Sequence, residues 1–67
     1  MTGCIKKTIQ DRGFGFIRPN GGGKDLFFHA KGLLNGLGIE DLKEGDHVQF
    51  EVEDGEKGPR AIKVERL

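Results

Sequence analysis

Residues 11–29 read DRGFGFIRPNGGGKDLFFH, two short hydrophobic runs separated by a glycine-rich segment. The runs at residues 14–18 and 26–29 are rich in phenylalanine and have the length of β-strands. Between them, Asn20 is followed by three glycines, a composition typical of a tight turn because glycine adopts left-handed backbone conformations without steric cost. This stretch therefore predicts two paired strands joined by a turn.

Three further segments have the character of strands. Residues 4–10 precede the first run, with a turn at residues 11–13. In residues 47–53, polar and apolar side chains alternate, so that Val48, Phe50 and Val52 share one face. Residues 61–67 follow a turn at Gly58-Pro59 and place Ile62 and Val64 on the core side.

No segment has a convincing helical period, and a long connection spans residues 30–45. Five short strands with a long third connection predict an all-β fold, a five-stranded antiparallel Greek-key barrel of the OB type. The length of 67 residues predicts a single domain, residues 1–67.

The direction of the phenylalanine side chains depends on which face of each strand lies in the core. In residues 26–29, Leu26 and Phe28 make the better core pair, because the alternative would bury the titratable His29. Phe27 and His29 are then exposed. In residues 14–18, spacing alone allows two arrangements: Gly15 and Ile17 in the core, or Phe14 and Phe16 in the core.

The first arrangement would produce an exposed aromatic patch on two paired strands, formed by Phe14, Phe16, Phe27 and His29. Exposed aromatic rings on adjacent strands stack unpaired bases, and each stacked base contributes about 1–3 kcal/mol. The pattern therefore points to single-stranded nucleic acid as the partner.

The charges divide unevenly along a chain whose formal net charge is zero. Residues 1–31 contain six lysines and arginines against two aspartates, a balance of +4, and residues 32–67 contain five against nine, a balance of −4. The division either creates a basic face that attracts phosphates or holds two halves of the barrel together. The cations available for phosphate contacts are Lys6, Lys7, Arg12, Arg18, Lys24 and Lys31.

Other classes of function find little support in the residues. Cys4 has no partner for an internal disulfide, and the two histidines lack the spacing of metal ligands. No nucleophile–base pair is evident, and residues 21–24 lack the spacing of a phosphate-binding loop. We expect no catalytic residue, metal, cofactor or small-molecule substrate, and no enzyme activity. A lone cysteine, no signal peptide and no apolar run of about 18 residues predict a cytoplasmic protein without a membrane span.

Several of these motifs resemble those of cold shock domains. Residues 12–17, RGFGFI, resemble the first ribonucleoprotein motif of that family, and residues 26–29, LFFH, resemble the second. The spacing of Gly3 and Gly13 and the segments at 22–25, 42–45 and 57–59 also match, so that the resemblance covers essentially the whole chain. It implies an OB-type barrel whose second and third strands bind single-stranded RNA or DNA, with Phe14, Phe16 and Phe27 facing outward.

The family further implies an RNA chaperone or a regulator of transcription or translation. Asp25 has two open interpretations: it accepts a hydrogen bond from an exocyclic base amine, or it caps the glycine-rich turn. The residues expected to contact nucleic acid are Lys6, Lys7, Arg12, Phe14, Phe16, Asp25, Phe27, His29, Lys57 and Arg60.

The chain departs from the family pattern at several aromatic positions. Lys7 occupies the position of a stacking tryptophan, Thr8 follows it in place of a phenylalanine, and Ala30 follows the motif histidine in place of an aromatic residue. In the long connection, Ile39 occupies an aromatic position. These departures imply a shorter footprint, weaker binding and a steeper salt dependence than is usual in the family.

The long connection also carries the apolar residues Leu33, Leu34, Leu37 and Ile39. They either cover an open end of the barrel or form a patch for a protein partner or a second copy of the chain. The family pattern places Leu42 inside. The alternative function is therefore a protein-interaction or dimerisation module; we expect a monomer, with a homodimer as the other possibility.

Overall fold

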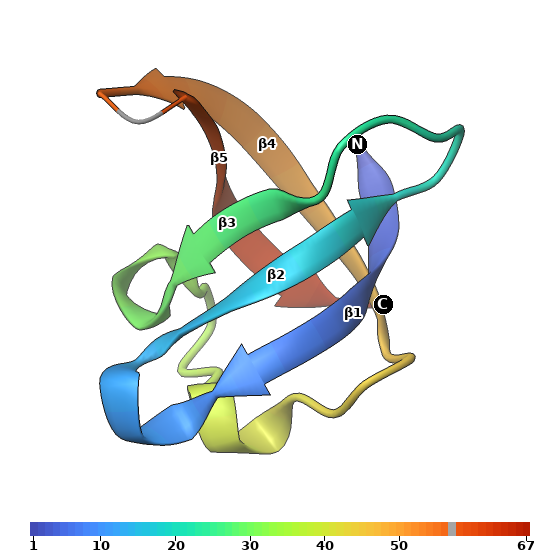
Figure 1. The fold of residues 1–67 in the computed structure, drawn as a ribbon. Helices are drawn as coiled ribbons and strands as arrows, with labels where there is room; N and C mark the ends of the chain where they lie inside the picture. Colours follow the sequence, from blue (N-terminus) through green and yellow to red (C-terminus); the bar gives the residue numbers. More distant parts are fainter. Residues whose placement is uncertain (57) are drawn as a thin grey trace.

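A computed structural model describes residues 1–56 and 58–67. It contains five strands and three short 3₁₀ turns, and the strands close into a barrel in the order β1-β2-β3-β5-β4 (Figure 1). The predicted all-β, OB-type barrel is thus confirmed. The elements are β1 (Thr2–Ile9), η1 (Gln10–Arg12), β2 (Phe14–Pro19), β3 (Leu26–His29), η2 (Ala30–Gly32), η3 (Ile39–Asp41), β4 (His47–Gly55) and β5 (Gly58–Arg66).

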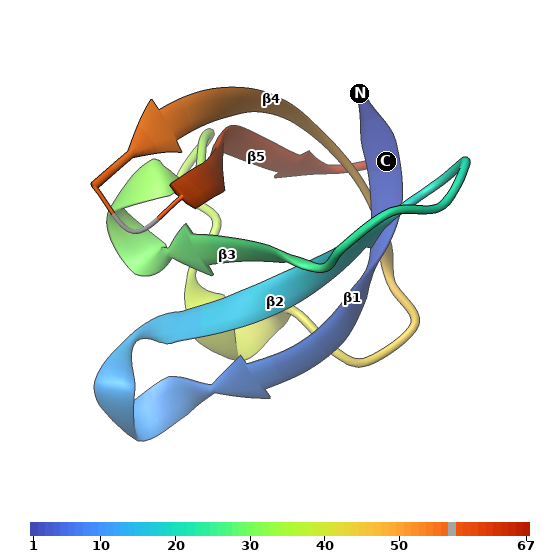
Figure 2. The ribbon, with the colours of Figure 1, turned by 45° about the horizontal axis from the view of Figure 1, so that its top comes forward.

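The barrel is built from four antiparallel pairings and one parallel pairing. β3 and β5 run parallel, with Phe27 opposite Arg60 and Phe28 opposite Ala61. β1, β2 and β3 lie side by side as one wall, and β4 and β5 form the other (Figure 2). Among the described residues, no helix is long and apolar enough to cross a membrane.

Among the described residues, ten hydrophobic side chains form the buried core. Ile17 is fully buried, which settles the choice left open by the spacing: Phe14 and Phe16 point outward. The expected burial of Leu26 and Phe28 is confirmed as well. The core side chains are Ile5, Ile17, Leu26, Phe28, Ile39, Leu42, Val48, Phe50, Ala61 and Val64.

Gly15 allows β2 to pack closely against its neighbours. A Cβ atom at this position would lie 2.8 Å from the ring carbons of Phe28 and 2.5 Å from the backbone oxygen of Lys7. Both distances are shorter than a van der Waals contact, so a side chain at residue 15 would displace β1 or the Phe28 ring. The glycine between the two outward phenylalanines is therefore required by packing.

A bulge in β1 sets the register between the first two strands. The pairing shifts between Ile5 and Lys7, so that Ile5 lies opposite Ile17 and Lys7 lies opposite Phe16. Lys6 is the extra residue at this shift, and bulges of this kind bend the strand. As a result, Lys7 shares the outer face of the sheet with Phe16.

Two expectations from strict alternation were wrong. Val52 is 40% exposed although Val48 and Phe50 are buried, because the buried part of β4 ends at Phe50 and the β4–β5 hairpin then projects from the barrel (Figure 1). In β5 the core positions are Ala61 and Val64, and Ile62 is half-buried. The left-handed backbone of Lys63, with a φ of 51°, breaks the two-residue period between them.

The long connection covers an end of the barrel. Ile39 and Leu42 are part of the core, and Leu33 and Leu37 pack against it, whereas Leu34 is 38% exposed. Most of the apolar residues of the connection are therefore explained by packing within the chain.

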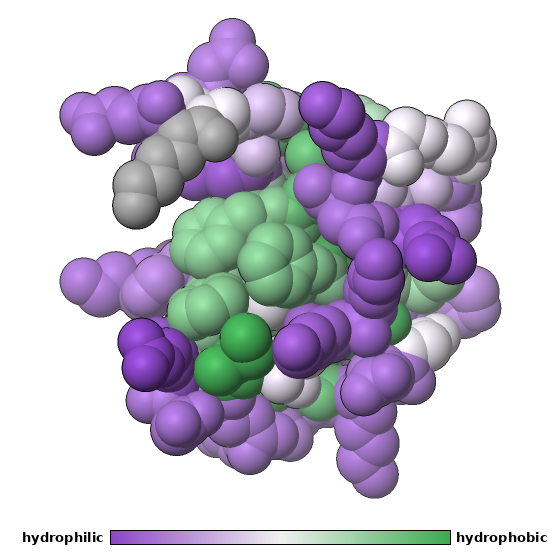
Figure 3. Space-filling view, in the orientation of Figure 1, coloured by the Kyte–Doolittle hydropathy of each residue, from purple (hydrophilic) through white to green (hydrophobic). Residues whose placement is uncertain are grey.

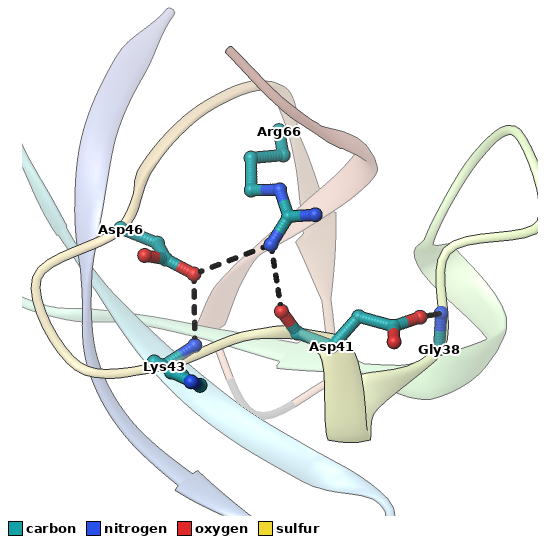
Figure 4. A network of polar contacts seen from close by, with 5 residues as sticks. All are labelled: Gly38, Asp41, Lys43, Asp46 and Arg66. Atoms are coloured by element: carbon teal, nitrogen blue, oxygen red, sulfur yellow. Dashed lines mark hydrogen bonds and ion pairs between the residues drawn. The ribbon is translucent and has the colours of Figure 1, made fainter.

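Arg66 at the end of β5 forms polar contacts with this connection (Figure 4). Its Nη1 donates a hydrogen bond to the backbone oxygen of Asp41 at 2.8 Å and lies 3.7 Å from the Oδ2 of Asp46. The two aspartates in turn accept hydrogen bonds of 2.9 Å from the backbone N–H groups of Gly38 and Lys43. The loop and the last strand are thus joined by one network of polar contacts.

Candidate nucleic-acid interface

Three phenylalanine side chains meet on the outer face of β2 and β3. Phe16 lies opposite Phe27 in the register, and Phe14 lies opposite His29. The ring centroids are 5.4 Å apart for Phe14 and Phe27, 6.0 Å for Phe14 and Phe16, and 6.2 Å for Phe16 and Phe27. We refer to Phe14, Phe16 and Phe27 as the phenylalanine cluster.

The phenylalanine cluster is half-buried and accessible to solvent. A hydrophobic patch occupies the centre of this face, over β2 and β3, and hydrophilic residues surround it (Figure 3). Leaving aromatic surface in contact with water is unfavourable, and an apolar patch with a polar rim is typical of an interaction site. The other two phenylalanines of the chain, Phe28 and Phe50, are buried in the core.

His29 borders the cluster at the end of β3. Its Nδ1 accepts a hydrogen bond of 3.1 Å from the backbone N–H of Lys31, which makes His29 the N-cap of η2. With Nδ1 accepting, a neutral imidazole carries its proton on Nε2. The exposed ring is therefore oriented by the turn and presents Nε2 as a donor.

The β1 edge of the patch carries a cation and an aliphatic side chain. Lys7 lies opposite Phe16, and Ile9 lies opposite Phe14. Arg12 is the last residue of η1. Gly13 follows it, and its φ of 73° turns the chain into β2. Within residues 1–56 and 58–67, neither Lys7 nor Arg12 forms an ion pair.

Lys6 and Asp25, both predicted to contact nucleic acid, form an ion pair with each other. The Nζ of Lys6 lies 2.6 Å from the Oδ2 of Asp25, and the Nε of Arg18 lies 4.0 Å from its Oδ1. This pairing was not among the interpretations that the sequence suggested for Asp25, because Lys6 lies on a different strand, 19 residues away. The carboxylate partly neutralises the cations on this side of the patch.

Arg60 lies on the opposite edge of the cluster, beside Phe27 in the parallel pair. Its Nε and Nη2 both donate to the Oε2 of Glu53, at 3.0 and 2.8 Å. The sequence prediction included Arg60 and missed Glu53. The register of the β4–β5 hairpin would have indicated this pair, because it places the two residues opposite each other. Lys57, also predicted to contact nucleic acid, lies outside the described residues.

Two shallow grooves adjoin Arg60. One is lined by Phe27, Arg60 and the turn between β4 and β5, including Asp54 and Glu56. The other is lined by His29, Arg60 and residues of η2 and β5 such as Lys31 and Ile62. The outer face thus continues from the phenylalanine cluster across the β3–β5 pair.

The ion pairs bear on the charge division of the sequence. In the described part of the chain, each of the five ion pairs joins two residues of the same half, either within 1–31 or within 32–67. Among the described residues, therefore, no ion pair joins the two halves. The balance of +4 belongs to the wall formed by β1, β2 and β3, which carries the phenylalanine cluster.

The aromatic positions that this chain lacks are not replaced elsewhere on the surface. Ile39, which occupies an aromatic position of the family pattern, is buried in the core. Ala30, which occupies another, packs against the core. The aromatic surface of this face consists of the phenylalanine cluster and the imidazole of His29. Among the described residues, no three His, Cys, Asp or Glu side chains are grouped to hold a metal ion.

Comparison with known proteins identifies similar chains. The family model described as 'Cold-shock' DNA-binding domain matches residues 1–67. The chain is 45% identical over 64 residues to "Cold shock-like protein CspC" of Escherichia coli strain K12, covering 96% of this chain and 91% of that protein. It is also 45% identical over 67 residues to "Cold shock-like protein CspA" of Vibrio cholerae, covering 100% of this chain and 94% of that protein.

Proposed function

We propose, since the chain belongs to the 'cold-shock' DNA-binding domain family, that it binds single-stranded RNA or DNA on the outer face of β2 and β3. It is a nucleic-acid-binding protein of the cold-shock type. The observation that supports this location is the phenylalanine cluster, three accessible rings within 6.2 Å of one another.

Stacking of unpaired bases on the cluster supplies most of the binding free energy in this proposal. Each base stacked on an aromatic ring contributes about 1–3 kcal/mol, and the contribution depends little on the base or the sugar. Three rings hold roughly three bases, and the donor Nε2 of His29 borders them. The expected ligand is therefore any unpaired stretch of RNA or DNA.

Phosphate contacts orient the strand across the cluster without reading its sequence. Lys7 and Arg12 supply these contacts on the β1 side. Lys6 and Arg60 contribute less to phosphate binding, because Asp25 and Glu53 already compensate their charges. Lys57 completes the proposed set of cations.

The biological role that follows is that of an RNA chaperone or a regulator of transcription or translation. A protein that binds only the unpaired form of a transcript shifts the equilibrium away from base-paired structures. This role requires binding and release, and no catalysis. The protein acts in the cytoplasm as a monomer in this proposal.

The alternative of a protein-interaction or dimerisation module is not favoured. Its motivations were the missing aromatic residues of the platform and the apolar residues of the long connection. Of these apolar residues, Leu33, Leu37 and Ile39 pack within the chain.

Fluorescence anisotropy of labelled single-stranded oligonucleotides, heptamers of T and of U, tests the proposal at low and moderate salt. Phe16→Ala and Phe27→Ala should each weaken binding by about 1–3 kcal/mol, roughly 5- to 150-fold. Leu34→Ala is the matched control, because it removes exposed apolar surface away from the cluster, and its affinity should equal that of the native chain. Absence of binding at low salt, or equal binding by all four proteins, would contradict the proposal.

A further inference from the structure

The ion pair between Arg60 and Glu53 places an oriented guanidinium group beside a stacking ring. Arg60 lies opposite Phe27 in the β3–β5 register, and both side chains line the same groove. In a sheet, opposite residues project from the same face, so Arg60 lies beside Phe27 on the outer face, within reach of a base stacked on that ring.

The hydrogen bonds leave part of the guanidinium available. Nε and one N–H of Nη2 donate to the same oxygen of Glu53, so Nη1 and the second N–H of Nη2 remain as a pair of adjacent donors. Both side chains are about half exposed. Glu53 thus restricts a side chain that would otherwise lose considerable rotamer freedom on binding.

The charge around this groove disfavours a phosphate. Asp54 and Glu56 line the groove together with Phe27 and Arg60. Glu53 forms an ion pair with Arg60. Among the described residues at this groove, the three carboxylates outnumber the guanidinium of Arg60, which favours an uncharged base over a phosphate beside Arg60. The group that meets the remaining donors of Arg60 is therefore a base edge.

We propose that Arg60, oriented by Glu53, recognises guanine stacked on Phe27. Guanine presents two adjacent acceptors, O6 and N7, which match two parallel donors of a guanidinium. Adenine presents a donor in place of O6, and pyrimidines have no N7. Arg60 is then a specificity-determining residue and Glu53 a positioning residue. The inference rests on the proposed function and adds a base preference to it.

The test compares heptamers of T that carry one central guanine or one central adenine, so that purine stacking is the same in both. Anisotropy should give roughly tenfold tighter binding of the guanine heptamer. Replacing guanine by 7-deazaguanine, which lacks N7, should remove most of this advantage. Replacing it by hypoxanthine, which keeps O6 and N7, should preserve it.

Variants of the pair test the same assignment in the protein. Arg60→Lys keeps the charge and removes the two parallel donors, so the ratio of guanine to adenine affinities should fall to about one. Glu53→Gln should lower the ratio in the same direction, because the guanidinium loses its charged anchor. Arg18→Lys is the matched control: its arginine also lies beside a carboxylate, at 4.0 Å from Asp25, and the ratio should not change.

Equal affinities for guanine and adenine heptamers would overturn the inference, as would a guanine advantage that survives in 7-deazaguanine or in Arg60→Lys. If Phe27→Ala still weakens binding in those cases, the proposed function stands and only the base preference is wrong. If Phe27→Ala has no effect, the stacking function itself is wrong.

Discussion

Lys7 is the residue that most changes the expected binding surface. It lies opposite Phe16 on the outer face, where the family pattern has a stacking tryptophan. An ammonium group attracts phosphates over a distance limited by salt, whereas an indole ring stacks a base with little dependence on salt. In the proposed interface, lysine at this position exchanges one stacked base for one electrostatic contact.

Lys7→Trp should reverse this exchange. We expect an increase in affinity of about 1–3 kcal/mol for an additional stacked base. The negative slope of log K against log salt should become shallower by about 0.7, because one phosphate contact is lost. Anisotropy titrations at several salt concentrations measure both quantities. Lys43→Trp is the control, because it makes the same change on the long connection; an equal gain there would indicate nonspecific attraction to the indole.

Individual residues also show where sequence reasoning stops. The outward direction of Phe27 could be predicted, because the alternative buried His29. The ion pairs of Asp25 and Glu53 could not. Asp25, in the loop before β3, pairs with Lys6 on β1, and Glu53 on β4 pairs with Arg60 on β5. Such ion pairs depend on the register between strands, which local patterns do not contain.

At the scale of elements, β2 combines an outward binding face with an inward face that has no room for a side chain at Gly15. Gly15→Ala should lower the free energy of unfolding by about 1–3 kcal/mol, because the new Cβ overlaps the Phe28 ring. Urea denaturation followed by circular dichroism measures the change. Gly32→Ala is the control, since a Cβ there has its nearest contacts at 3.6 Å. Equal stability of the two variants would contradict the prediction, because it would show that the neighbours of Gly15 move aside at little cost.

Strand positions were predictable wherever the backbone keeps a regular pleat. Alternation places the side chains of β3 and the first half of β4 correctly. Alternation fails in β5, because Lys63 adopts a left-handed backbone conformation that the local sequence does not indicate. It also fails at Val52, because the hairpin extends past the core. β1 begins at Thr2, two residues before the predicted start, because its first residues pair with β4. The period of a pattern thus predicts faces but gives no sign of bulges or of where the core ends.

At the scale of the whole molecule, the apolar residues of the long connection are largely used for packing within the chain and leave Leu34 as the exposed one among the described residues. The connection residues Leu33 and Leu37 pack against the core. Static light scattering should therefore give the monomer mass of 7.4 kDa at every concentration. A mass that rises with concentration and falls in Leu34→Ala would instead identify the connection as a dimer contact.

The parallel pair of β3 and β5 closes the barrel through two aligned residue pairs, between segments some thirty positions apart in the chain. We expect a short seam between such distant segments to form late in folding and to be a place where the native state opens transiently. A nucleic-acid strand in contact with both Phe27 and Arg60 touches both sides of it. If the proposed interface is correct, ligand binding should hold β3 and β5 together. Amide hydrogen exchange along β3 should then slow by RT ln(1 + L/Kd), where L is the free ligand concentration, because the opened barrel does not bind the ligand.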